Sequence, residues 1–136
     1  MISFNYELDF QLSSEEQVSD WLSSVIKSEN YNEGNINYVF CDDEYLHKLN
    51  VEFLDHDTLT DIISFDYSVG KELHGDVYIS IERVRENAND FSEAFTNELK
   101  RVMVHGILHY CGYKDKTEAD AITMREKENH YLNQFA

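Results

Sequence analysis

The sequence of 136 residues contains no proline and only two cysteines, Cys41 and Cys111. Without proline, internal repeats or low-complexity stretches, no segment has the composition of a linker, so we expect one domain over residues 1–136. Two cysteines cannot form the disulfide framework of a small secreted protein, and the first residues do not pair a basic stretch with an apolar run as a signal peptide does. We therefore expect a cytoplasmic protein.

Basic residues are also scarce. Lysine and arginine number 11 against 27 aspartate and glutamate residues, which gives a formal net charge of −16. A surface this acidic repels anionic lipid and bare phosphate backbones, which excludes nucleic-acid binding through bulk charge. No apolar run approaches the roughly 18 residues of a membrane span, so no membrane partner is expected. The content of 42% hydrophobic and 13% aromatic residues is nevertheless typical of a packed core.

The spacing of apolar residues predicts the order of the elements: strand, helix, strand, helix, a two-stranded hairpin, and three helices. Ser13 with Glu16 has the spacing of a capping box, and Asp42 is placed to cap the second helix. The fold class is α+β (or α/β), with a small mixed sheet of about four strands packed by helices. The predicted ranges are 2–12, 13–27, 36–40, 42–53, 61–67, 73–81, 80–89, 92–111 and 117–136.

Two histidines near the C-terminus have the spacing of metal ligands. His105 and His109 lie four residues apart, so both imidazoles project from one face of a helix. Gly112 lets that helix end, and the chain can then turn back to bring Asp115 to the same point. Two imidazole nitrogens and one carboxylate oxygen leave a coordination position open, as in catalytic zinc sites. The sequence therefore predicts one divalent ion, zinc; the alternative is a pair of histidines that hydrogen-bond within the core.

Three segments resemble motifs of the YbeY family of metal-dependent endoribonucleases, which are implicated in ribosomal RNA maturation and ribosome quality control. Residues 105–115, HGILHYCGYKD, are similar to the family's H-G-x-L-H-x-x-G-Y-x-H. Residues 50–65 resemble N-x-x-Y-R-x-x-D-x-P-T-D-V-L-S-F, and residues 75–80 resemble G-D-I-x-I-S. The resemblance implies a single-strand-specific endoribonuclease that acts on ribosomal RNA precursors, with the ribosome or a ribosome-associated protein as partner.

Two departures from the family's pattern bear on the site. Asp115 stands where the family has a third histidine, and its added negative charge makes harder ions such as Mn²⁺ or Fe²⁺ more competitive with zinc. Leu54 stands where the family has an arginine, whose guanidinium suits phosphate. Arg83, Arg85 or Lys114 are candidates to replace that arginine.

The resemblance implies that His105, His109 and Asp115 are catalytic through water activated by the metal ion. Either that water or the neighbouring 2′-hydroxyl of the RNA attacks phosphorus. Weaker candidates for substrate binding are Asp61, Ser64 and Asp76 in the two strand motifs, together with Lys114; for the three strand residues, capping or cross-strand hydrogen bonding is the structural alternative.

Two other functions remain open from the sequence. The ligand spacing is also that of metzincin-type peptidases, but these carry a glutamate after the first histidine, where this chain has Gly106. A non-catalytic ribosome-assembly module with a structural metal is the second alternative, favoured by Leu54 and the net charge of −16. The acidic run 93–98 is interpreted as a solvated helix face.

Overall fold

A computed structural model describes residues 1–54 and 60–135, which form an α+β fold with a four-stranded sheet and five helices. The strand order is β1-β2-β4-β3; β1, β2 and β4 are parallel, and β3 pairs antiparallel with β4 at one edge. The predicted mixed sheet and order of elements are confirmed. The elements are β1 (Ile2–Tyr6), α1 (Glu15–Ser28), β2 (Asn32–Cys41), α2 (Asp43–Leu54), β3 (Ile62–Asp66), β4 (Glu72–Ser80), α3 (Ile81–Asp90), α4 (Phe95–Tyr110) and α5 (Glu118–Leu132).

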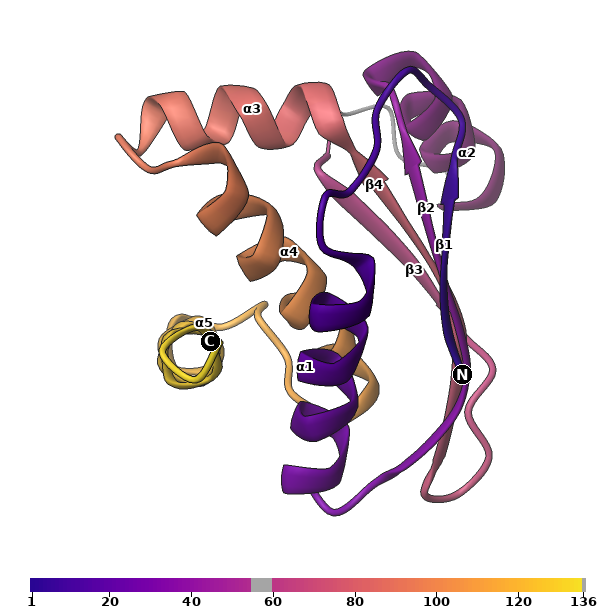
Figure 1. The fold of residues 1–136 in the computed structure, drawn as a ribbon, viewed down its shortest axis with the longest axis vertical. Helices are drawn as coiled ribbons and strands as arrows, with labels where there is room; N and C mark the ends of the chain where they lie inside the picture. Colours follow the sequence, from indigo (N-terminus) through magenta and orange to yellow (C-terminus); the bar gives the residue numbers. More distant parts are fainter. Residues whose placement is uncertain (55–59, 136) are drawn as a thin grey trace.

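The helices are divided unequally between the two faces of the sheet (Figure 1). Helices α1 and α4 cover one face, α2 lies on the other, and α5 packs on the outer side of α4. Because α4 lies between the sheet and α5, it is apolar on most sides, and Met103, Ile107 and Leu108 are fully buried in the main core. Burial of each such side chain stabilises the fold by about 1.5–3 kcal/mol. Helix α4 is thus held from several directions.

The largest difference from the predicted ranges is in the first strand, which ends at Tyr6 rather than at residue 12. The amide of Glu7 still donates to the Phe40 carbonyl oxygen, at 2.8 Å, but the chain then leaves the sheet. Alternation persists beyond Tyr6 because every second side chain still packs against the core. The residues concerned are Leu8, Phe10 and Leu12.

The start of β2 and the N-cap of α1 also differ from the prediction. Strand β2 begins at Asn32 rather than at 36, because Asn32 and Glu33 also pair with the start of β4 before a register shift. The predicted capping box is wrong: the N-cap of α1 is Ser14, which makes no side-chain hydrogen bond. The predicted cap of α2 is confirmed, since the Tyr45 amide donates to Asp42 Oδ1 at 2.8 Å.

Within residues 1–54 and 60–135, no helix has the combined length and apolarity that crossing a lipid bilayer requires.

Glu29, at the C-terminal end of α1, joins three parts of the chain. Its carboxylate accepts hydrogen bonds from the Tyr113 hydroxyl at 2.8 Å, from Lys127 Nζ at 3.3 Å and from the Tyr131 hydroxyl. Burial raises the pKa of Glu29, but the three donors favour the carboxylate by more, so its pKa is lowered from the ordinary value. Glu29 therefore fixes α5 to α1 as an anion.

Replacement of Glu29 by glutamine should lower the free energy of unfolding by about 1–3 kcal/mol at pH 7, because it removes charged hydrogen bonds from a mostly buried site. The lowered pKa means that this stabilisation is complete above the unfolded pKa of about 4.3 and is lost as the pH falls through the folded value. Urea titrations should therefore show a difference at pH 7 that shrinks below pH 4. The exposed Glu126→Gln on α5 is the control; equal effects of both variants would contradict the role of Glu29.

Candidate metal centre

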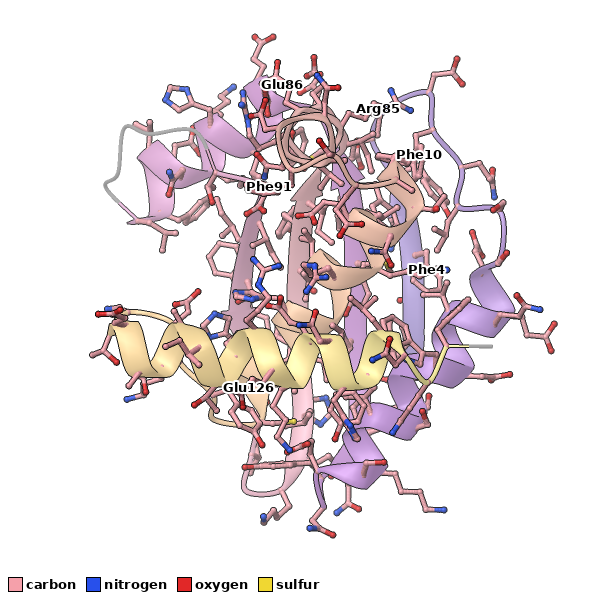
Figure 2. The ribbon with its side chains drawn as sticks, turned by 90° about the vertical axis from the view of Figure 1, so that its left-hand side faces the viewer. Phe4, Phe10, Arg85, Glu86, Phe91 and Glu126 are labelled. Carbon is pink, nitrogen blue, oxygen red and sulfur yellow. The ribbon has the colours of Figure 1, made fainter. Side chains whose placement is uncertain are left out.

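A cavity of about 530 Å³ lies between β3, α4 and α5, with the end of α3 at its rim. Residues from all four elements line it, including His105, His109 and Asp115. Figure 2 views the molecule from the side on which α5 crosses in front and α3 is seen end-on above it. The predicted ligand residues thus lie in a hollow that is open to solvent.

The three predicted ligands converge on one point. His105 Nε2 and His109 Nε2 are 3.0 Å apart, and Asp115 Oδ2 lies 3.2 Å from the first and 3.4 Å from the second. One ligand atom from each residue falls within 4.8 Å of the others. The i, i+4 geometry of α4 brings the histidines together, as the sequence predicted.

The end of α4 positions Asp115. Gly112 has a φ of +98°, in the left-handed region that favours glycine. Its amide donates to the His109 carbonyl oxygen at 3.0 Å, and the Tyr113 amide donates to that of Leu108 at 3.1 Å. This pair of bonds is a Schellman motif, which reverses the chain at the end of a helix. The turn brings Asp115 back to the two histidines.

The donor set fits a divalent cation. Glu128 Oε2 lies 2.7 Å from His105 Nδ1, which assigns the proton to Nδ1 and leaves the lone pair of Nε2 facing His109 and Asp115. Lone pairs of two imidazoles and a carboxylate that point at one another repel unless a cation or a proton lies between them. Such mixed nitrogen and oxygen ligands are those that zinc accepts.

The pKa values of the two histidines are shifted in opposite directions. Burial lowers the pKa of His105, but the hydrogen bond and charge of Glu128 and the charge of Asp115 raise it by more. Burial and the neighbouring His105 lower the pKa of His109. His109 therefore favours the neutral form that binds metals.

Behind the histidines lies a buried charge network that the sequence interpretation missed. Arg101 Nη1 donates to Glu128 Oε1 at 3.3 Å and to Asn129 Oδ1 at 2.8 Å, and Arg101 Nε lies 3.7 Å from Glu98 Oε1. Glu98 is buried, which corrects the interpretation of 93–98 as a solvated face. The spacing of Glu128 from Met124 and Tyr131 could have indicated its role, because it places a carboxylate on the buried face of α5.

The weaker candidates are distributed differently. Asp61 and Ser64 line the cavity, and the Asp61 carboxylate accepts a hydrogen bond from Asn87 Nδ2 at 3.3 Å. Burial raises the pKa of Asp61. Asp76 and Lys114 are not among the described residues that line the cavity. Residues 55–59 of the second motif lie outside the described residues.

The positively charged side chains that line the cavity also differ from those that the sequence suggested as replacements for the family's arginine. Leu54 lies half-exposed at the end of α2, and neither it nor Arg83 nor Arg85 is among the described lining residues. Arg83 pairs with Asp43 and Glu86, and the Arg85 guanidinium lies 5.0 Å above the Phe95 ring. The two arginines that do line the cavity are Arg101 and Arg125.

Comparisons with known proteins identify the family and the fold. The family model described as Endoribonuclease YbeY matches residues 3–136. The Endoribonuclease YbeY of Flavobacterium johnsoniae is 64% identical over 135 residues, covering 99% of this chain and 97% of that protein. That of Christiangramia forsetii is 55% identical over 134 residues, covering 98% and 94%. The solution structure of a Thermotoga maritima protein superposes with a TM-score of 0.72 at 28% identity, covering 99% of this chain and 89% of that one.

Replacement of both His105 and His109 by alanine should abolish binding of one equivalent of zinc, because two of the three donors are removed. Asp115→Ala should weaken binding, and Asp115→His should retain it by supplying an imidazole. Elemental analysis after dialysis and zinc titration of the folded variants measure the effect, with the exposed His130→Ala as control. Stoichiometric zinc in the double variant would contradict the assignment.

Glu128→Gln should reduce zinc affinity by about 10- to 100-fold, the usual loss when a carboxylate behind a ligating histidine is removed. Glu126→Gln, on the exposed face of the same helix, should leave the affinity unchanged. Competition with a chromophoric chelator gives the dissociation constants, and circular dichroism reports whether each variant folds. Equal affinities of the two folded variants would show that Glu128 does not orient His105.

Proposed function

This chain belongs to the YbeY family of endoribonucleases, and we propose that His105, His109 and Asp115 hold one zinc ion with which it cleaves single-stranded RNA during ribosomal RNA maturation. The observation that carries the proposal is the convergence of three ligand atoms within 4.8 Å at a solvent-open cavity. We further propose that the protein takes part in ribosome quality control. We also propose that it acts in the cytoplasm and that residues 1–136 form one domain.

The side chains of the site have different roles. His105 and His109 each present Nε2, and Asp115 adds one negative charge beside them. Glu128 holds the His105 ring and its tautomer from behind. A divalent ion in this position supplies Lewis-acid chemistry, which withdraws charge from a phosphoryl oxygen and makes a nearby water more acidic.

The size of the cavity and the charge of the protein are compatible with an RNA strand that another molecule presents. A cavity of about 530 Å³ is within the range of sites for small ligands, so it takes a nucleotide-sized portion of a strand rather than a duplex. The net charge of −16 weakens the affinity for free RNA. We propose that the ribosome or a ribosome-associated protein presents the strand.

The peptidase alternative conflicts with the packing of Gly106. A Cβ at this position would lie 3.3 Å from Ile62 Cδ1 and from Val77 Cγ1, so the residue faces β3 and β4 and not the cavity. A glutamate base following the first histidine would have no room there. The position that peptidases of this spacing use for proton transfer is therefore closed in this chain.

Addition of a chelator should lower the rate of cleavage of single-stranded ribosomal RNA precursors by at least about 100-fold, as expected for loss of an acid–base and electrostatic catalyst. Added Zn²⁺ or Mn²⁺ should restore it, and His109→Ala should remain inactive. The metal-free protein should stay folded, because α4 and its contact with α5 form from protein groups alone. Gel analysis of cleavage and circular dichroism measure the two properties.

An activity that survives both chelation and His109→Ala would come from a contaminant. A folded, zinc-loaded protein that cleaves no ribosomal RNA precursor would contradict the proposal and favour the assembly module. A substrate with a single 2′-deoxynucleotide at the cleaved position then separates the two nucleophiles: cleavage persists if water attacks and stops if the 2′-hydroxyl does.

A further inference from the structure

Phe91 is an exposed aromatic residue at the rim of the cavity. The residue is 61% exposed and lines the same cavity as the two histidines. Among the described lining residues, it is the sole phenylalanine, tyrosine or tryptophan. Figure 2 shows it at the near end of α3, above α5. The ring is therefore available to a molecule that enters the cavity.

The backbone of Phe91 is fixed although its ring is exposed. Ser92 has a φ of +55°, and its amide donates to the Asn89 carbonyl oxygen at 3.2 Å. The Glu93 amide donates to the carbonyl oxygen of Ala88 at 2.8 Å. These two bonds complete a Schellman motif at the end of α3. Phe91 thus lies on a rigid turn, which reduces the entropy lost when its ring binds a partner.

Arg125 supplies positive charge on the opposite side, from α5. It lines the cavity, is 56% exposed in its side chain, and has a long contact of 3.7 Å with Glu128. Arg101, the other lining arginine, is buried and hydrogen-bonded to Glu128 and Asn129. Of the described cations in the cavity, Arg125 is thus the one whose guanidinium is open to an incoming anion. Guanidinium groups bind phosphate through two parallel hydrogen bonds.

We propose that Phe91 and Arg125 form a binding site for one nucleotide of single-stranded RNA, which rests on the function proposed above. Phe91 stacks on a base, and Arg125 binds a phosphate on the α5 side of the His105, His109 and Asp115 group. A base within a duplex is already stacked on both sides, so only an unpaired base can take this position. The site therefore selects single strands, with little preference for sequence because every base has a stacking face. Arg125 supplies the phosphate contact that Leu54 cannot make.

The test of Phe91 uses a matched pair of exposed phenylalanines. Phe91→Ala should weaken binding of a single-stranded RNA oligomer to the metal-free protein by about 5- to 100-fold, as loss of one stacking aromatic does. Phe91→Trp should preserve binding. Phe53→Ala, in which an equally exposed ring (62%) on α2 is removed, should have no effect. Fluorescence anisotropy gives the dissociation constants.

The test of Arg125 uses the salt dependence. Arg125→Gln should weaken binding and reduce the slope of log affinity against log salt by about 0.7, the value for one phosphate contact in a single strand. Lys71→Gln, at the exposed hairpin between β3 and β4, removes the same charge and should leave the slope unchanged. A purely structural role of Arg125 would not change this slope.

The outcomes separate this proposal from the proposed function. If Phe91→Ala and Arg125→Gln bind RNA like their controls while cleavage still requires metal and His109, the nucleotide site is wrong and the endoribonuclease assignment stands. If the wild-type protein does not cleave, the binding measurements on the metal-free protein still decide the site. An effect of Phe91→Ala on a protein partner with unchanged RNA binding would also overturn the proposal.

Discussion

The hydrogen bond between His105 Nδ1 and Glu128 Oε2 couples the docking of α5 on α4 to the orientation of the candidate metal ligands. It joins two helices whose only other polar links at this depth pass through Arg101, among the residues that the structure describes. Buried charges cost several kcal/mol each unless they are paired. Glu128 is stabilised by Arg101 on one side and by His105 on the other, so the network is compensated only when α5 is in place.

This arrangement explains why α4 is both the most buried helix and the one that carries the site. Its side toward the sheet is apolar, with Met103 and Ile107 in the core, while its opposite side carries Arg101, His105 and His109 at intervals of four residues. A rigid helix held by packing keeps the two imidazoles aligned without a bound ion. The scaffold thus bears the entropic cost of ordering the ligands during folding rather than during binding.

The parts of the site that could be predicted from sequence are those set by local geometry. The i, i+4 spacing of His105 and His109 fixes their proximity in any helix, and Gly112 makes the return of Asp115 possible within the next few residues. Glu128, Arg125 and Phe91 could not be assigned in this way, because their place at the cavity depends on how α3 and α5 pack against α4. The end of β1 was missed for a related reason: alternating burial continues through Phe10 after strand pairing has stopped.

The three candidate ligands lie within residues 105–115, whereas Glu128 follows 13 residues after the last of them. The segment that carries the three ligands is short, so bringing them together costs little chain entropy. The ligand group can therefore assemble as soon as α4 and its turn have formed. Local folding of residues 105–115 therefore suffices to bring the three ligands together, whereas the orientation of the His105 ring also requires that α5 dock and place Glu128 behind it.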